Sequence, residues 1–341
     1  MMRFDPYTLL KDSQHRRVEY VRFSITDRCN YRCTYCMPAT GLQFHHKADL
    51  LTYEEIVRLA TIFISLGIRR VRLTGGEPLV RKHLAGELVA ALSRLDGIED
   101  LAMTTNGHLL NDYADVLYAA GLRRINVSVD TLDPARFSQI TRGGNLTRVL
   151  SGIEKAKALG MIPLKINAVV VAGVNEFDPP SLIRYSAERG FILRLIEYMP
   201  IGVDDNWKTG FVSLQQIKQR LAESYEFDDC DPVVGGGPAH YLQLSPKNGS
   251  HEPVRVGFIA ALSENFCAHC NRVRVTSDGR LRECLSREGF LSLRNLMRQG
   301  ADDTEIGAAI RRALFMKVDG HSFGAEHGHV ATLQTMSSIG G

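Results

Sequence analysis

The chain has 341 residues, of which 44% are hydrophobic, so it can bury the core of one large domain or of two moderate ones. Its 41 basic and 38 acidic residues leave a formal net charge of +3, too balanced to indicate a nucleic-acid or membrane partner. The first twenty residues mix charges and contain no apolar run, and no later run reaches membrane-spanning length. We therefore expect a cytoplasmic globular protein in which any anion site is local.

Strands and helices are expected to alternate through the first 200 residues. Short β-rich runs lie at about 20–26, 69–74, 100–104, 124–130, 163–171 and 191–198. Helical patterns lie between them, at about 52–66, 84–95, 109–120, 146–159 and 179–188. Thr52 and Glu55 are spaced as a capping box at the start of the first helix. This alternation predicts βαβ crossovers and a parallel sheet.

The strands share a further pattern, an apolar face opposite a polar one, because strand side chains alternate with period two. The polar faces carry Arg22, Ser24, Thr26, Arg72, Thr74, Asn126, Ser128, Asp130, Lys165 and Asn167. A doubly wound sheet covered on both faces is apolar on both, so a repeated polar face favours a curved sheet whose concave side holds a polar ligand. We predict an α/β fold, an incomplete TIM-type (βα)6 barrel, with unusual sequences where its strands end: TDRCN, TGGEP, TTNG, SVD and EYMP.

The regular alternation ends after Pro200, and a second region is expected from 201 to 341. It begins with a polar loop around Trp207 and a helix at about 213–223, followed by a glycine-rich turn at 233–238. Two strands at 241–244 and 255–257 and two helices at 291–297 and 304–315 complete it. We therefore predict a barrel over 1–200 and a C-terminal α+β region over 201–341.

Six of the seven cysteines fall into two tight groups, which favours metal ligation in a reducing compartment over a disulfide framework. Cys29, Cys33 and Cys36 form CxxxCxxC directly after the first strand. Three thiolates can hold three irons of a cubane and leave the fourth iron open to a small molecule. The alternative is a zinc site completed by His45 or His46.

Cys267, Cys270 and Cys284 form the second group. Taken alone, this spacing is equally typical of a zinc knuckle, with three candidates for the fourth ligand: His240, His251 and His269. The first group shifts the balance toward iron and sulfur. Cys230 stands alone and is expected to be a partly buried small hydrophobe.

The chain resembles the radical S-adenosylmethionine superfamily in its CxxxCxxC motif and in GGEP at 75–78 after the second strand. The second cysteine group, the CNRVR sequence and the final MSSIGG resemble one family within it, the GTP 3',8-cyclases, also called molybdenum cofactor biosynthesis protein A. This likeness runs from about Arg22 to the last residue. It implies a lyase with two 4Fe-4S clusters, the second with an open iron that faces the guanine base.

The resemblance also implies the reaction. A 5'-deoxyadenosyl radical from S-adenosylmethionine takes the ribose 3' hydrogen of GTP, giving (8S)-3',8-cyclo-7,8-dihydroguanosine 5'-triphosphate in the first step of molybdenum cofactor synthesis. The cofactor supplies the difficult chemistry, and the protein supplies orientation and exclusion of water.

The resemblance also implies site residues, each at a position where this sequence matches a motif of the family. The implied cluster ligands are Cys29, Cys33 and Cys36 for the first cluster and Cys267, Cys270 and Cys284 for the second. The implied S-adenosylmethionine contacts are Tyr35, Gly76, Ser128 and Met199. The implied GTP contacts are Arg22, Arg72, Thr104, Lys165, Arg272 and Arg274, of which Arg272 and Arg274 are also expected to serve catalysis together with the first three cysteines. Arginine suits phosphate because its planar fork makes two charge-assisted hydrogen bonds.

Some of these residues have simpler interpretations. Gly76 can be an ordinary turn glycine or a position where the backbone approaches the ligand, and strand cations are often solvated surface charges. Gly340 and Gly341 are expected to reach the active site, although a flexible terminus is the generic interpretation of such an end.

Other functions stay open at this stage. One is another radical S-adenosylmethionine enzyme with an auxiliary cluster, such as a peptide-modifying maturase, although those usually carry more C-terminal cysteines. Another is a zinc or iron-sulfur binding module. For the cyclase, the expected partners are an electron donor, a downstream cyclic pyranopterin monophosphate synthase and a second copy of the chain in a homodimer, with no membrane and no nucleic acid.

Overall fold

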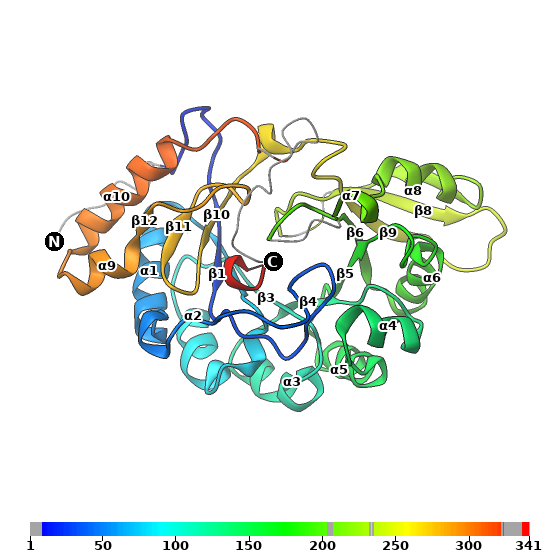
Figure 1. Ribbon diagram of the computed structural model, residues 1–341, viewed down its shortest axis with the longest axis horizontal. Helices are drawn as coiled ribbons and strands as arrows, with labels where there is room; N and C mark the ends of the chain where they lie inside the picture. Colours follow the sequence, from blue (N-terminus) through cyan, green and yellow to red (C-terminus); the bar gives the residue numbers. More distant parts are fainter. Residues whose placement is uncertain are drawn as a thin grey trace.

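The computed structural model describes residues 9–202, 207–231, 233, 235–321, 323 and 336–340. One curved sheet runs through the molecule in the order β12-β11-β10-β1-β2-β3-β4-β5-β6-β9-β8-β7 (Figure 1). Its central strands pair in parallel in chain order: β1 (Tyr20–Ser24), β2 (Arg70–Thr74), β3 (Asp100–Thr105), β4 (Arg124–Ser128), β5 (Lys165–Val170) and β6 (Ile192–Glu197). The predicted six-stranded parallel barrel core is confirmed.

Helices follow the central strands and cover the outer side of the sheet (Figure 1). They are α1 (Tyr53–Ser65), the π-helix η3 (Leu84–Val89) continued by α2 (Ala90–Ser93), α3 (Leu110–Ala119), α4 (Pro134–Thr141), α5 (Leu146–Ala158) and α6 (Pro179–Arg189). Short 3-10 turns lie at η1 (Lys47–Asp49), η2 (Pro78–Val80) and η4 (Cys267–His269). No helix in the described ranges is long and apolar enough to cross a membrane.

The first helix shows why these elements form where they do. Thr52 and Glu55 make the expected capping box, which satisfies backbone donors at the start of α1. Apolar residues at helical spacing on α1 are buried against the apolar face of β1, where the rings of Phe23 and Phe63 meet edge to face with centroids 6.0 Å apart. The apolar face of the sheet therefore builds the core and leaves the polar face on the concave side.

The C-terminal region extends the same sheet at both edges. Its strands are β7 (Tyr225–Asp229), β8 (His240–Pro246), β9 (Val254–Ile259), β10 (Arg272–Val275), β11 (Arg280–Arg282) and β12 (Leu291–Ser292). β9 joins β6 in parallel and β10 joins β1 in parallel, while the remaining strands add antiparallel. The sequence predicted strands near β8 and β9 but not the parallel neighbour of β1.

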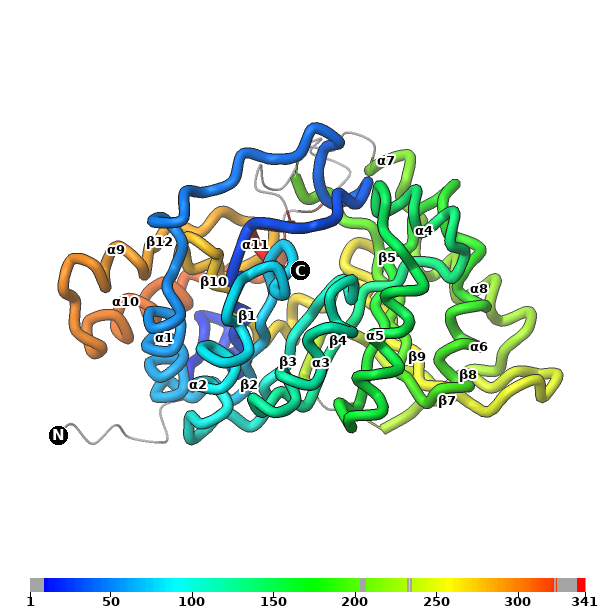
Figure 2. Tube along the Cα trace, turned by 90° about the horizontal axis from the view of Figure 1, so that it is seen from below, coloured from blue at the N-terminus to red at the C-terminus, as the bar shows by residue number. Residues whose placement is uncertain are grey.

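The helices of this region are spread over the molecule. They are α7 (Trp207–Gly210), α8 (Leu214–Leu221), α9 (Leu293–Arg298), α10 (Asp303–Phe315) and α11 (Met336–Ile339). Figure 2 shows α9 and α10 at the end away from α6 and α8. The short helix α11 lies inside the curve of the sheet near β1, as Figure 1 shows.

Register aligns the polar side chains of neighbouring strands. Arg22 pairs with Arg72 on one side and with Arg274 on the other, which places three guanidinium groups in one row. One strand further along, Thr104 pairs with Asn126. The polar face predicted from alternation is therefore a continuous concave surface.

Candidate active site

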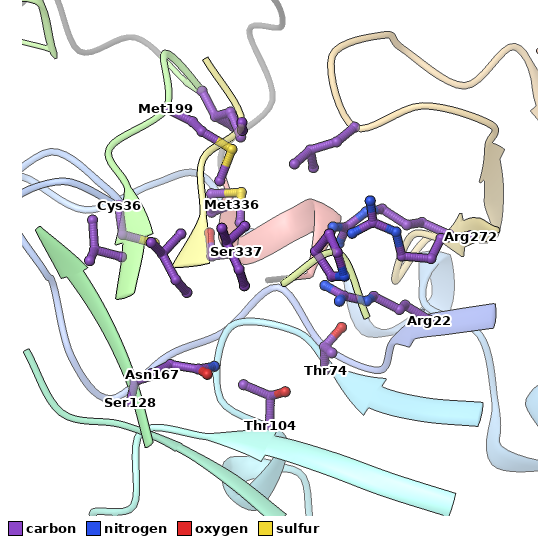
Figure 3. Close-up of a pocket in the computed structure, with 18 of the residues that line it drawn as sticks. Arg22, Cys36, Thr74, Thr104, Ser128, Asn167, Met199, Arg272, Met336 and Ser337 are labelled. Atoms are coloured by element: carbon purple, nitrogen blue, oxygen red, sulfur yellow. The ribbon is translucent and has the colours of Figure 1, made fainter. Parts of the chain in front are cut away.

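A cavity of about 280 Å³ opens on the concave face of the sheet. All six grouped cysteines line it: Cys29, Cys33, Cys36, Cys267, Cys270 and Cys284. Figure 3 shows Arg22 and Arg272 entering the cavity from one side and Cys36 and Met199 from the other. Two groups that are far apart in the chain therefore share one chamber.

The first cysteine group lies on the loop after β1. Backbone bonds from Cys36 N and Met37 N to Cys33 O fold this loop into a tight turn. Tyr31 N donates to Cys29 Sγ at 3.4 Å, and the Asn106 side-chain amide lies 3.8 Å from the same sulfur. Burial raises the pKa of Cys29 to about 11 and that of Cys36 to about 12. These thiols therefore hold their protons until a bound cation displaces them.

Gly76 brings the GGEP loop against the cysteine loop. Gly76 N donates to Thr26 O and Glu77 N donates to Arg28 O, both at 2.8 Å. A Cβ at Gly76 would collide with Arg28 O. The structure thus requires this glycine for the contact between two loops of the chain, a reason that the sequence analysis did not consider.

Glu77 is a functional residue that the sequence analysis missed. Its buried carboxylate accepts hydrogen bonds from Leu79 N at 3.0 Å and from Thr105 Oγ1 and Asn106 N, both at 2.7 Å. Burial raises its pKa to about 7. Glu77 therefore fixes the loop after β3 to the loop after β2, and with it the amide that faces Cys29.

Asp130 plays a similar part for Tyr35. The Tyr35 hydroxyl donates to the Asp130 carboxylate at 2.7 Å, and Val169 N donates to its other oxygen at 2.9 Å. Burial raises the pKa of Asp130 to about 6. The arrangement holds the Tyr35 ring at the wall of the cavity.

The second cysteine group lies around β10 and β11, the strands beside β1. Cys267 begins the turn η4, Cys270 follows it, and Cys284 follows β11. Although burial raises the pKa of Cys270, the cations of Arg272 and Lys317 outweigh it and lower the value to about 6. This thiol therefore sits in a strongly cationic environment.

The cysteines determine which metal sites fit. The only histidine among the described residues lining the cavity is His321, which is none of the expected zinc ligands. Within the described ranges, no three His, Cys, Asp or Glu side chains gather as ligands of a single metal ion do. In a cubane each cysteine binds a different iron, and three thiols on one wall fit that donor set.

Arginines form the remaining wall. Those lining the cavity are Arg22, Arg72, Arg194, Arg272, Arg274 and Arg282. Burial, followed by repulsion from Arg72 and Arg272, lowers the pKa of Arg22 to about 10. Nε of Arg22 and of Arg72 and two nitrogens of Arg194 have no hydrogen-bond partner in the described part of the chain. Buried guanidinium donors without partners are costly, so this wall fits a polyanion.

The sequence-predicted contacts mostly meet in this cavity. Its lining includes Tyr35, Gly76, Thr104, Ser128 and Met199 as well as four of the predicted arginines. Lys165 is the exception, because it is buried outside the lining with Nζ 3.4 Å from the Tyr241 hydroxyl. Burial, then Arg194 and Arg124, lowers the pKa of Lys165 to about 6.

Arg194 and Arg282 were missed. On the predicted last strand, Arg194 and Glu197 fall on opposite faces, so alternation did not show which face of this strand is polar. Both residues nevertheless line the cavity. Arg282 lies on β11, a strand that the sequence did not predict.

The end of the chain reaches the same cavity. Met336 and Ser337 line it, and Ser337 N donates to the sulfur of Cys36. Gly340 O accepts a hydrogen bond from Arg274 Nη1, and φ at Gly340 is +85°. A Cβ at Gly340 would collide with Thr74 Oγ1. Gly341 lies outside the described residues.

Two family models match successive parts of the chain. Residues 23–185 match the Radical SAM superfamily and residues 191–323 match Molybdenum Cofactor Synthesis C. The chain is 46% identical over 336 residues to the GTP 3',8-cyclase of Caulobacter vibrioides, covering 97% of this chain and 94% of the relative. It is 41% identical to the GTP 3',8-cyclase of Moorella thermoacetica, covering 97% and 100%.

Among solved structures, Streptococcus suis SuiB bound to precursor peptide SuiA aligns with a TM-score of 0.61 over 90% of this chain and 73% of that one. The identity of 13% makes this a likeness of fold alone. The relatives named above, by contrast, are matched over nearly their whole length. The chain therefore belongs to the GTP 3',8-cyclase family of the radical S-adenosylmethionine superfamily.

Proposed function

We propose that this chain is a lyase that converts GTP to (8S)-3',8-cyclo-7,8-dihydroguanosine 5'-triphosphate in the first step of molybdenum cofactor synthesis. The observation that carries this proposal is the shared cavity, which is lined by two cysteine triads and by buried arginines with unpaired donors. A polyanionic nucleotide satisfies those donors and lies between the triads.

We assign Cys29, Cys33 and Cys36 as ligands of a 4Fe-4S cluster whose open iron binds S-adenosylmethionine. When bound, this pair supplies a 5'-deoxyadenosyl radical that takes the ribose 3' hydrogen of GTP. Tyr35 and Gly76 form the adjacent wall, supported by the Asp130 and Gly76 hydrogen bonds described above. Ser128 and Met199 complete the proposed S-adenosylmethionine contacts.

We assign Cys267, Cys270 and Cys284 to a second 4Fe-4S cluster that faces the guanine base. The proposed GTP contacts are Arg22, Arg72, Thr104, Lys165, Arg272 and Arg274, to which the unpaired nitrogens of Arg194 add one more. Fixed guanidinium groups hold the triphosphate, orient the ribose and need no reorganisation during the reaction. The buried walls exclude water, which strengthens the electrostatic contacts between the guanidinium groups and the triphosphate.

The wider assignment is also a proposal. Residues 1–200 form the radical barrel and 201–341 the auxiliary-cluster and substrate-binding region. We propose a cytoplasmic location, an electron donor that reduces the first cluster, a homodimer, and delivery of the product to a cyclic pyranopterin monophosphate synthase.

An anaerobic incubation tests the proposal. The cluster-reconstituted protein is mixed with S-adenosylmethionine, dithionite and GTP, and 5'-deoxyadenosine and GTP are followed by chromatography. Formation of 5'-deoxyadenosine together with loss of GTP is expected. Deoxyadenosine without loss of GTP would point to another substrate, such as the peptide of a maturase, and absence of both would contradict the radical chemistry.

A further inference from the structure

Lys317 follows α10 and lies beside the second cysteine triad. Its side chain is buried, with the residue only 3% exposed. Its ammonium donates to Arg272 O at 2.5 Å and to Glu283 O at 2.8 Å. Its positive charge also acts on the Cys270 thiol. One cation therefore holds two carbonyls beside the triad and lies close to one of its sulfurs.

These contacts join the two halves of the triad. Arg272 lies two residues after Cys270, and Glu283 immediately precedes Cys284. The two segments are separated in sequence, and β10 and β11 lie between them. The Lys317 ammonium fixes the distance between these segments by bonding one main-chain carbonyl of each. Main-chain carbonyls keep their direction when side chains repack, so the link is rigid.

The charge of Lys317 needs an anion. In the described part of the chain, the oxygen atoms that its ammonium contacts belong to main-chain carbonyls, which carry only partial charge. A buried ammonium without a counter-charge is unfavourable, because its lost hydration is not repaid by an ionic partner. A cubane held by three thiolates is an anion, and cations and hydrogen bonds at its sulfurs stabilise the reduced form.

We propose that Lys317 is a positioning residue that holds the second triad in place and supplies the counter-charge that raises the reduction potential of its cluster. The proposal rests on the assignment of Cys267, Cys270 and Cys284 as ligands.

Arg16 provides a matched control. It ties the turn that carries Cys267 to the segment directly after Lys317, because its guanidinium donates to Cys267 O at 2.8 Å and to Val318 O at 2.7 Å. Its charge is already balanced by Asp12, whose carboxylate lies 2.6 Å from Arg16 Nε. Replacing both members of this pair removes a tether of the triad without changing the net charge near its sulfurs.

The experiment uses the full chain with Cys29, Cys33 and Cys36 replaced by alanine, so that only the second cluster gives a signal. After anaerobic reconstitution, iron and sulfide per chain are measured, and the reduced cluster is followed by EPR in a redox titration. Lys317→Met is expected to lower the ratio of reduced to oxidised cluster about tenfold at a fixed solution potential. This corresponds to a fall of about 59 mV in the reduction potential of a one-electron couple. The Asp12→Asn/Arg16→Gln variant is expected to lose iron but keep the parent potential.

Further variants separate the possible failures. If Lys317→Met does not fold, Lys317→Gln, which keeps a donor but not the charge, is expected to show the same fall in potential, whereas Lys317→Arg is expected to restore it. An unchanged potential in a folded, uncharged variant overturns the proposal. Full iron content in Cys284→Ala overturns the ligand assignment instead.

Discussion

The two cysteine triads have the same number of thiols but opposite electrostatic surroundings. The first lies near the carboxylates of Glu77 and Asp130, and burial there raises the pKa of its thiols. The second lies near Arg272 and Lys317, which lower the pKa of Cys270. Anionic surroundings favour a low reduction potential and cationic ones a higher potential. A cluster at the first triad is therefore expected to have a lower reduction potential than one at the second, in keeping with the roles proposed for them.

The sharpest test of this division removes one ligand from each triad. Cys29→Ala is expected to abolish 5'-deoxyadenosine formation, because the cluster that binds S-adenosylmethionine loses one of three ligands. Cys284→Ala is expected to keep slow deoxyadenosine formation but to abolish loss of GTP. Chromatography of both products under anaerobic conditions makes the measurement, and deoxyadenosine formation by Cys29→Ala at the parent rate would contradict the division.

The arginine wall gives the next largest effect. Arg72→Ala is expected to weaken GTP binding by about 2 kcal/mol, or roughly 30-fold, because a charge-assisted hydrogen bond to phosphate is lost. S-adenosylmethionine binding should stay at the parent value. Equilibrium dialysis measures both. Arg148→Ala is the control, since Arg148 pairs with Asp112 at an exposed site; equal losses in the two variants would exclude Arg72 from the site.

Lys165 is one of the proposed GTP contacts, and its buried ammonium allows a test by pH. Its pKa is lowered to about 6 by burial and by Arg194 and Arg124, so the unfolded chain holds a proton that the folded chain lacks between about pH 6 and its ordinary value. The free energy of unfolding without ligand therefore rises with pH across this window.

A bound triphosphate reverses part of this shift, so GTP binding is expected to take up about one proton at pH 7.5 and to weaken as the pH rises. Calorimetry in buffers of different ionisation enthalpy measures the uptake. Lys165→Met is expected to lose it, and uptake that matches the parent protein would mean that another group titrates.

The smallest effect is expected for a substitution of Tyr35, which lies on the same loop as the first triad. Tyr35→Phe removes the 2.7 Å hydrogen bond to Asp130 and is expected to weaken S-adenosylmethionine binding by about 1 kcal/mol, or roughly fivefold. GTP affinity measured in parallel should not change. A similar loss for both ligands would show that Tyr35 supports the whole cavity.

Local pattern was enough to predict much of this molecule. Alternation along single strands predicted the barrel core and placed Arg22 and Arg72 on its polar face, because the period of two is a property of each strand by itself. Capping chemistry likewise predicted the start of α1. The resemblance supplied Arg272 and Arg274, but nothing in the sequence placed them on a strand beside β1.

What the sequence did not predict depends on contacts between distant segments. Glu77 acquires its role from the loop after β3, and Lys317 from carbonyls on two other segments. Glu77 lies within the GGEP motif, which marks the loop but not the partners of this carboxylate, and Lys317 lies in no motif. Arg194 was missed because its strand lacks clean alternation, although its register with Asn167 places it on the polar face.

The parallel pairing of Tyr20 with Arg272 and of Leu193 with Val256 has a consequence for biogenesis. During synthesis, the outer edges of β1 and β6 stay unpaired until the last third of the chain emerges, and unpaired strand edges are templates for aggregation. Contacts so distant in sequence also slow folding. The nascent barrel therefore depends on timely completion of the chain, and truncation before β10 is expected to give an insoluble product rather than a smaller working enzyme.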